Sequence, residues 1–232
     1  MTVRHVVMVP SLGRPATDFE PLYPALRAAG FEPVPVEPRP SWDGNATLHD
    51  LARDTVSQLD ALGIGTFHLV GHAFGNRLSR TITADFGGRV ESLTLLAAGG
   101  LVEPDPQMFV LLNRCFDAAL PDDEHLDTVR QVFFAPGNDP SVWRDGWMRE
   151  VAAYQRAAML ATPREDWWGA SVDRVLVVQA LQDAIAPPGN GRRYVAESAP
   201  QARLVEIDGA GHAMIPERPE LISAALVEFL SA

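Results

Sequence analysis

Cysteine is almost absent from this 232-residue chain, which has a single one, Cys115. One thiol cannot form an internal disulfide or a metal cluster, so the sequence favours a reduced, cytoplasmic setting with Cys115 as a small buried hydrophobe in a helix. Long apolar runs are also absent, and Pro10 and Gly13 interrupt the apolar start too early for a secretory signal. We therefore expect no membrane partner.

Basic residues are scarce, since 19 Lys and Arg stand against 30 Asp and Glu, for a formal net charge of −11. Binding to nucleic acid needs clustered Lys and Arg that neutralise phosphates, and here the basic residues are scattered along the chain. The composition therefore predicts no nucleic-acid partner. Apolar residues make up 47% and charged residues 21%, which is typical of a folded globular domain of this length.

Internal repeats are lacking too, and the sequence has instead short apolar runs that alternate with helical patterns. The alternation predicts a parallel sheet of about six strands with helices on both faces. Thr47 is expected to cap one of the helices. The predicted strands are 6–9, 31–36, 67–70, 90–97, 175–180 and 202–207, and the predicted helices outside the segment described next are 17–29, 48–63, 76–86, 192–197 and 219–230.

The alternation stops between residues 101 and 170, where the pattern is helical with breaks at Pro121, Pro136 and Pro163. This segment predicts a helical insertion that covers an apolar pocket and selects the substrate. We expect about a third of its aromatic and Met side chains to contact a ligand and the rest to pack on the sheet. Those side chains are Phe109, Phe116, Phe133, Phe134, Trp143, Trp147, Met148, Tyr154, Met159, Trp167 and Trp168.

The strand predicted at 67–70 runs into the sequence Gly71-His72-Ala73-Phe74-Gly75. This pattern resembles the G-x-S-x-G turn that lifts a nucleophilic serine above a sheet, with Ala73 in the place of the serine. Gly71 and Gly75 are the small residues that such a turn needs. A glycine-rich turn between a strand and a helix can also be purely structural, so the motif requires support from other residues.

That support comes from an acid and a histidine that each follow a predicted strand. Asp183 comes just after the strand at 175–180, and His212 comes just after the strand at 202–207, preceded by Gly211. Open α/β sheets place their sites at the carboxyl ends of their strands. The order turn, acid, histidine along the chain is that of the α/β-hydrolase triad.

These features resemble the α/β-hydrolase superfamily, especially its small bacterial members with a lid, over nearly the whole chain. The resemblance implies an α/β-hydrolase fold without the first two family strands, because Val6 begins what corresponds to the third. It also implies a core of residues 1–100 and 171–232 with a helical lid at 101–170. The motifs that carry it are Ser11-Leu12-Gly13, the sequence 71–75, Asp183 and Gly211-His212.

The same resemblance implies roles for individual residues. Backbone N–H groups of Leu12 and Phe74 would form an oxyanion hole, and Asp183 would orient His212 as a general base. No metal and no cofactor is expected, the partner is a small-molecule substrate, and a homodimer is left open. The residues expected to line the substrate pocket are Ser11, His72, Trp143, Trp147 and Trp168.

Ala73 decides which chemistry is open to this site. A methyl group cannot attack a carbonyl carbon, so no acyl-enzyme can form at residue 73 of this sequence. Two origins of the alanine stay open: an engineered Ser→Ala change, or a natural alanine beside a retained Asp183 and His212. The expected function is that of a hydrolase-family enzyme for a small apolar carbonyl compound such as an ester or lactone. The alternatives are a lyase, cyclase or dioxygenase that uses only the His/Asp base, and a ligand-binding protein without catalysis.

Overall fold

A single six-stranded sheet forms the centre of the molecule in a computed structural model that describes residues 3–199 and 201–232. All neighbouring strands are parallel, and their order is β2-β1-β3-β4-β5-β6. The prediction of a parallel sheet of about six strands is confirmed. The strands are β1 (Arg4–Val9), β2 (Phe31–Pro35), β3 (Phe67–His72), β4 (Val90–Leu96), β5 (Val175–Ala180) and β6 (Arg203–Ile207).

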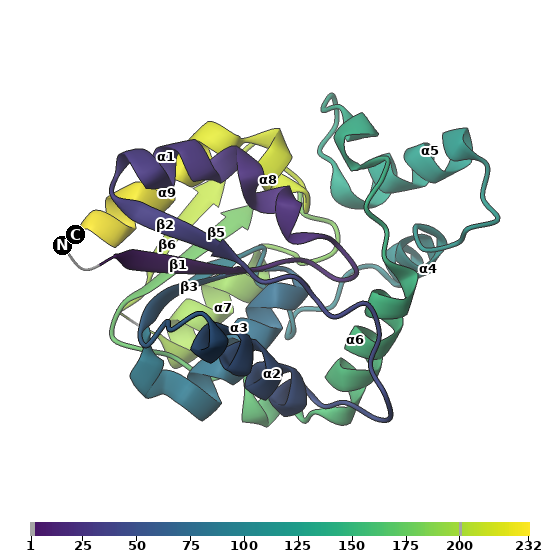
Figure 1. The fold of residues 1–232 in the computed structure, drawn as a ribbon. Helices are drawn as coiled ribbons and strands as arrows, with labels where there is room; N and C mark the ends of the chain where they lie inside the picture. The colour runs from purple at the N-terminus through teal and green to yellow at the C-terminus, as the bar shows by residue number, and fades with distance from the viewer. Residues whose placement is uncertain (1–2, 200) are drawn as a thin grey trace.

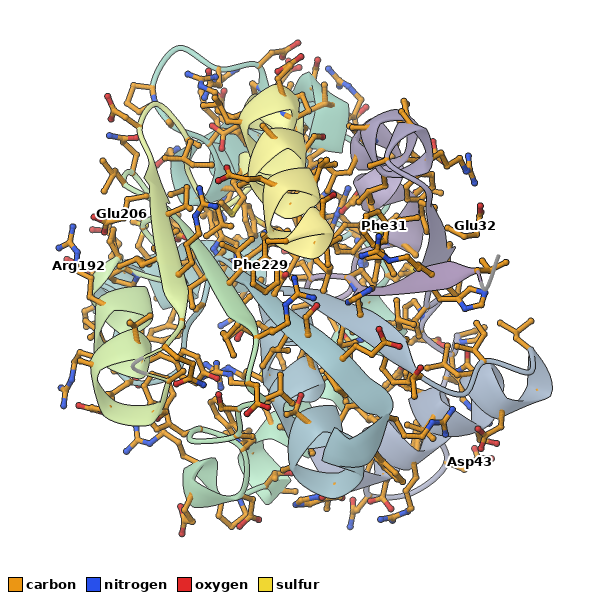
Figure 2. The ribbon with its side chains drawn as sticks, turned by 90° about the vertical axis from the view of Figure 1, so that its left-hand side faces the viewer. Phe31, Glu32, Asp43, Arg192, Glu206 and Phe229 are labelled. Atoms are coloured by element: carbon orange, nitrogen blue, oxygen red, sulfur yellow. The ribbon has the colours of Figure 1, made fainter. Side chains whose placement is uncertain are left out.

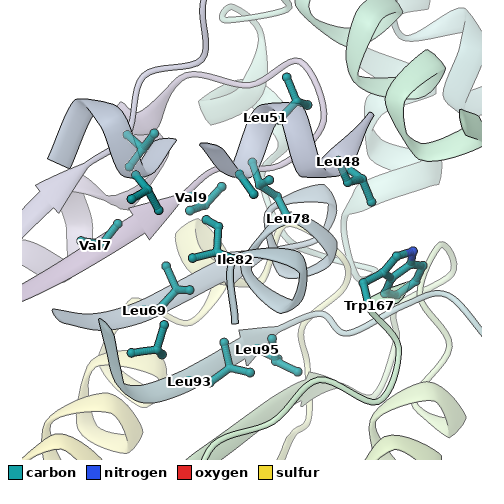
Figure 3. Close-up of a cluster of buried hydrophobic side chains, with 14 of the residues drawn as sticks. Val7, Val9, Leu48, Leu51, Leu69, Leu78, Ile82, Leu93, Leu95 and Trp167 are labelled. Carbon is teal, nitrogen blue, oxygen red and sulfur yellow. The ribbon is translucent and has the colours of Figure 1, made fainter. Parts of the chain in front are cut away.

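Helices cover both faces of this sheet (Figure 1). Side chains that alternate along β1 divide between two buried clusters, with Val7 and Val9 on one face and Val6 and Met8 on the other. The first face, part of which is drawn in Figure 3, is covered by α2 (Leu48–Ala61), α3 (Phe74–Phe86) and α7 (Gly189–Ser198). The second is covered by α1 (Tyr23–Ala28) and α9 (Pro219–Ser231).

Thr47 caps α2, as its sequence position predicts. The Thr47 hydroxyl accepts the Asp50 N–H at 3.2 Å, and the Asp50 carboxylate accepts the Thr47 N–H at 2.8 Å. This reciprocal arrangement satisfies two backbone donors that a helix start leaves free, and such a cap contributes about 1 kcal/mol. The cap therefore fixes where α2 begins.

The prediction of one continuous helix at 17–29 is wrong. The chain there makes a 3₁₀ helix, η1 (Ala16–Leu22), followed by the short α1. Pro21 and Pro24 interrupt the helical pattern, and neither can donate a backbone N–H to an α-helical hydrogen bond. The sequence analysis also missed α8 (Met214–Glu217), a single turn that comes just after His212.

Figure 2 views the molecule from another side, with α9 lying across the sheet. Phe229 of α9 is buried, and its ring lies 5.2 Å from the Arg174 guanidinium. At the outer edge, Arg192 of α7 pairs with Glu206 of β6 at 2.8 Å. Charged side chains on an edge strand discourage pairing with another sheet, so this pair protects the exposed edge.

Residues 101–170 form the predicted helical insertion, and they contain no strand. Figure 1 shows α4 and α5 standing away from the sheet, while α6 lies near α2. Pro121 and Pro163 lie at the starts of helices, which accounts for the breaks in the pattern. The division into a core and a lid stays a prediction. The helices are α4 (Pro106–Arg114), α5 (Asp122–Phe133), η3 (Pro140–Trp143), α6 (Arg149–Ala161) and η4 (Arg164–Asp166).

Among the described residues, no helix has both the length and the apolar character needed to cross a bilayer.

Candidate active site

The turn at Ala73 joins β3 directly to α3. Ala73 has φ 54° and ψ −109°, a backbone conformation that costs a non-glycine residue about 1 to 3 kcal/mol. A Cβ on Gly75 would clash with the Val9 carbonyl oxygen, and a Cβ on Gly71 would clash with the backbone of Gly75. The Ala73 N–H donates to the Leu96 carbonyl at 3.0 Å, which ties the turn to β4. The sequence 71–75 therefore forms a sharp, strained turn at the carboxyl edge of the sheet.

Asp183 and His212 lie in contact beside this turn. His212 Nδ1 is 2.8 Å and 3.0 Å from the two Asp183 carboxylate oxygens, and both side chains are buried. Asp183 Oδ1 also accepts the N–H groups of Ile185 at 2.9 Å and Ala186 at 2.7 Å. A carboxylate only accepts hydrogen bonds, so the His212 proton resides on Nδ1 and Nε2 is left as the basic nitrogen.

His72 holds the loop of His212 through a hydrogen bond to its backbone. Its Nε2–H donates to the His212 carbonyl oxygen at 2.8 Å, and the two rings lie 5.5 Å apart. Burial, together with the neighbouring His212, lowers the pKa of His72 to about 3, so this imidazole is neutral near pH 7. His72 therefore holds the backbone of His212 and is not among the residues that line the cavity.

A cavity of about 130 Å³ lies between the turn, the histidine and the insertion. Ala73 and His212 both line it, as do Ser11, Leu12 and Phe74. The structure thus brings together side chains from the loops after β1, β3 and β6. The insertion contributes apolar side chains to the same cavity, namely Val102, Pro104, Phe109, Leu112, Phe133 and Met159.

The three tryptophans expected in the pocket lie elsewhere. Trp143 is buried against Phe133 and Phe134, with ring centres 5.3 Å and 5.8 Å away. The Arg14 guanidinium lies over both Trp143 at 4.5 Å and Trp147 at 4.8 Å.

Trp168 packs on Tyr194, with ring centres 5.9 Å apart. Like Trp143 and Trp147, it is not among the residues that line the cavity. These large rings join the insertion to the core, which leaves the lining to smaller apolar side chains.

Leu12 and Phe74, the two residues expected to form an oxyanion hole, both line the cavity. Phe74 is the first residue of α3, where a backbone N–H has no partner within the helix. The loop that holds Leu12 is fixed by α6, because the Gly13 N–H donates to the Gln155 side-chain oxygen at 2.8 Å.

Glu217 is a supporting residue that the sequence analysis missed. Its carboxylate accepts the N–H groups of Gly211 and Ala135, both at 2.7 Å, and the Asn138 amide at 2.5 Å. Burial raises the pKa of Glu217, while these hydrogen bonds lower it. Glu217 thereby joins the loop that precedes His212 to the end of α5. Nothing in the spacing of the sequence indicates this link, because it spans more than 80 residues.

Gln179 is a second missed residue, and here the sequence carries a signal. It is the one amide in the otherwise apolar strand β5, and buried polar groups in a core normally have hydrogen-bond partners. Its oxygen accepts the Ala98 N–H at 3.1 Å, and its nitrogen donates to the Ala186 carbonyl at 2.7 Å. Gln179 thus fixes the loop after β4 relative to the loop of Asp183.

The described residues contain no group of three or more His, Cys, Asp or Glu side chains placed to hold a metal ion. Cys115 is buried, and burial raises the pKa of its thiol to about 12, so this thiol stays protonated.

A strained strand-to-helix turn, a histidine oriented by a carboxylate and an adjoining cavity define a class of α/β proteins with hydrolase-type sites. The sequence profile of the Alpha/beta hydrolase family matches residues 6–225. The chain belongs to this family.

Relatives within the family have names that describe hydrolases. The chain is 29% identical over 205 residues to "Putative carbamate hydrolase RutD" of Caulobacter vibrioides, a match that covers 79% of this chain and 72% of the relative. It is 26% identical over 212 residues to rhodomycin D methylesterase DauP of Streptomyces sp., covering 76% of this chain and 71% of the relative. The enol-lactonase of Burkholderia xenovorans LB400 shares the fold, with a TM-score of 0.83, 22% identity and coverage of 100% of this chain and 93% of that one.

Proposed function

We propose that this protein is an enzyme that acts on a small, largely apolar carbonyl compound bound in the cavity beside Ala73. His212 acts as the general base, Asp183 orients it, and the N–H groups of Leu12 and Phe74 bind the oxyanion. The observation that carries the proposal is the contact of His212 Nδ1 with the Asp183 carboxylate at 2.8 Å, which leaves Nε2 as a base on the cavity wall.

The alanine dictates that water is the nucleophile in this proposal. His212 Nε2 removes a proton from a water molecule as its oxygen bonds to the carbonyl carbon, and the carbonyl oxygen becomes an oxyanion held by backbone N–H groups. When the tetrahedral intermediate collapses, the bond to the leaving group breaks and that group takes the proton from the imidazolium. Asp183 stabilises the charged ring between the two transfers.

The names of the relatives support a substrate with an acyl carbon and a heteroatom leaving group. The relatives include proteins named as a carbamate hydrolase and a methylesterase, and a structural neighbour is named as an enol-lactonase. Esters, lactones and carbamates share the carbonyl that the site would polarise. Either origin of the alanine fits this class, because a restored serine would act on the same carbonyl.

The insertion acts as a lid in this proposal. Six apolar residues of the segment 101–170 line the cavity, and three of them, Phe109, Phe133 and Met159, belong to the aromatic and Met set of the sequence analysis. A lid that contributes apolar lining selects apolar substrates and excludes bulk water from the base.

A second candidate function rests on the same alanine. A base that faces a cavity without a nucleophile beside it can remove a proton from an acidic C–H or O–H of the substrate, as in a lyase, cyclase or dioxygenase. A pure binding protein would use the cavity without the base. His212→Ala separates an enzyme from a binding protein, because it would remove either reaction and leave ligand affinity unchanged in a binding protein.

Replacement Ala73→Ser tests the proposed site directly. The variant should gain hydrolysis of an activated aryl ester such as p-nitrophenyl butyrate, about 10³-fold or more above the unchanged chain. The double variant Ala73→Ser/His212→Ala is the matched control and should lose that gain. Absence of any gain in the single variant would contradict both the assigned base and the assigned oxyanion hole.

A further inference from the structure

Arg77 places a cation in the wall of the cavity. It lies in the first turn of α3, four residues after Ala73, the residue that precedes this helix. Both line the cavity. The mechanism proposed above gives Arg77 no role.

The Arg77 guanidinium has no carboxylate within 4 Å among the described residues, unlike most arginines of the chain. The guanidinium carbon lies 5.3 Å from the centre of the Trp167 ring. Burial lowers the pKa of Arg77, and Arg164 lowers it further, while Glu103 opposes them. A partly buried charge without a partner is costly, so the site would gain from an anion that completes it.

Two further arginines, Arg80 and Arg164, add positive charge near Arg77. Arg80 is fully buried on the same helix and lies over Trp167 at 4.6 Å. Its Nη2 donates to Asn76 Oδ1 at 2.7 Å and to the Gly99 carbonyl at 2.8 Å, and its Nη1 has no protein partner. Arg164 donates to the Gly100 carbonyl at 3.2 Å.

Three arginines therefore gather around one end of the cavity, in a chain whose net charge is −11. Glu103 is the only acidic residue among those that line the cavity, and its side chain is exposed. An exposed carboxylate is screened by water and neutralises a neighbouring cation only in part. This end of the cavity is accordingly suited to an anion.

We propose that Arg77 binds a carboxylate of the substrate, so that the enzyme selects acyl compounds that carry an acid group a few carbons from the reacting carbonyl. This inference rests on the proposed function, because it assumes that the carbonyl lies beside Ala73 and His212. A guanidinium binds a carboxylate through two parallel hydrogen bonds, which would fix the substrate's orientation as well as its charge. Glu103 competes for the same guanidinium and weakens binding of the anion.

Calorimetric titration with two matched ligands tests this inference. Monomethyl glutarate carries the anion, and its neutral amide, methyl 5-amino-5-oxopentanoate, has nearly the same shape. The unchanged chain should bind the anion about tenfold or more tightly than the amide, as expected for a charge-assisted hydrogen bond. Arg77→Gln should remove this preference without changing affinity for the amide, and Arg77→Lys should retain part of it.

Two further variants complete the experiment. Arg193→Gln, on the exposed face of α7, is the matched control and should keep the full preference. Glu103→Gln should raise affinity for the anion. Equal affinities for both ligands in the unchanged chain, or a preference that survives Arg77→Gln, would overturn the role of Arg77 and leave the proposed function standing. Failure of both ligands to bind, together with no esterase gain in Ala73→Ser, would overturn the proposed function itself.

Discussion

The sheet edge and the helical insertion build the same cavity by different means. At the sheet edge, backbone geometry and buried hydrogen bonds fix each group: the strained turn at Ala73, the Asp183–His212 contact and the amide of Gln179. The insertion contributes mainly apolar side chains to the lining and joins the core through a few polar links, such as Glu217 to Ala135. Groups that react need fixed positions, whereas groups that select a substrate need only shape and apolar surface.

The comparison predicts that changes at the sheet edge have the largest effect on catalysis. Asp183→Asn should lower the turnover of the Ala73→Ser variant by about 10⁴-fold, because an amide can hold the wrong tautomer of His212. Steady-state hydrolysis of p-nitrophenyl butyrate measures this. Asp208→Asn, an exposed acid just after β6, is the matched control and should leave turnover unchanged. A similar loss of turnover in both variants would contradict the specific role of Asp183 in orienting His212.

Substitutions in the turn at Ala73 should also lower the free energy of unfolding strongly. Gly75→Ala should reduce the free energy of unfolding by about 3 kcal/mol or more, because the added methyl meets the Val9 carbonyl and the core cannot yield easily. Gly87→Ala adds the same methyl at the end of the same helix, where nothing lies within 4 Å. Urea unfolding of both variants checks the prediction, and equal stabilities would contradict the tight approach of α3 to β1.

Glu217 joins the two regions, so its replacement sharpens the comparison. Glu217→Gln keeps the shape but replaces one acceptor oxygen by an amide, which leaves a buried N–H of Gly211 or Ala135 without its partner. The expected cost is about 1 to 3 kcal/mol of stability, with a lower kcat for the Ala73→Ser variant. Glu220→Gln, in the first turn of α9, serves as the control. Urea unfolding and turnover are measured on the same preparations. If Glu217→Gln changes neither, the proposed link is contradicted.

A smaller effect is expected at His49, which joins α2 to α3 and to the end of the insertion. Its ring nitrogens lie 2.8 Å from Asp85 and 3.4 Å from Asp166, and the Asp85 hydrogen bond raises the pKa of His49. A raised folded-state pKa gives a stabilisation that is complete below about 6.5, the unfolded value, and is lost as pH rises through the folded value.

Melting temperatures between pH 6 and pH 8 measure this contribution of His49. The unchanged chain should lose more stability over this range than His49→Gln does. The difference should be small because the ring is partly exposed. Identical pH profiles of the two proteins would show that this histidine does not join the regions.

Sequence reasoning succeeded where the chemistry is local in the chain. The turn at 71–75 and the positions of Asp183 and His212 follow from short motifs at strand ends, so the fold and the meeting of these groups could be predicted. Sequence reasoning failed for the insertion, because no strand periodicity there indicates which aromatic side chains face the cavity. Trp143, Trp147 and Trp168 were expected in the pocket and instead pack the insertion onto the core. Glu217 was missed because two of its three partners, Ala135 and Asn138, are distant in sequence.

The central claim is that a base held by Asp183 faces residue 73 across the cavity, and covalent labelling tests it most directly. Incubation of Ala73→Ser with diethyl p-nitrophenyl phosphate should attach one diethyl phosphoryl group to the introduced serine, detected by intact-protein and peptide mass spectrometry. The double variant Ala73→Ser/His212→Ala should label at least 10²-fold more slowly. An unlabelled single variant, or equal labelling of both, would contradict the account.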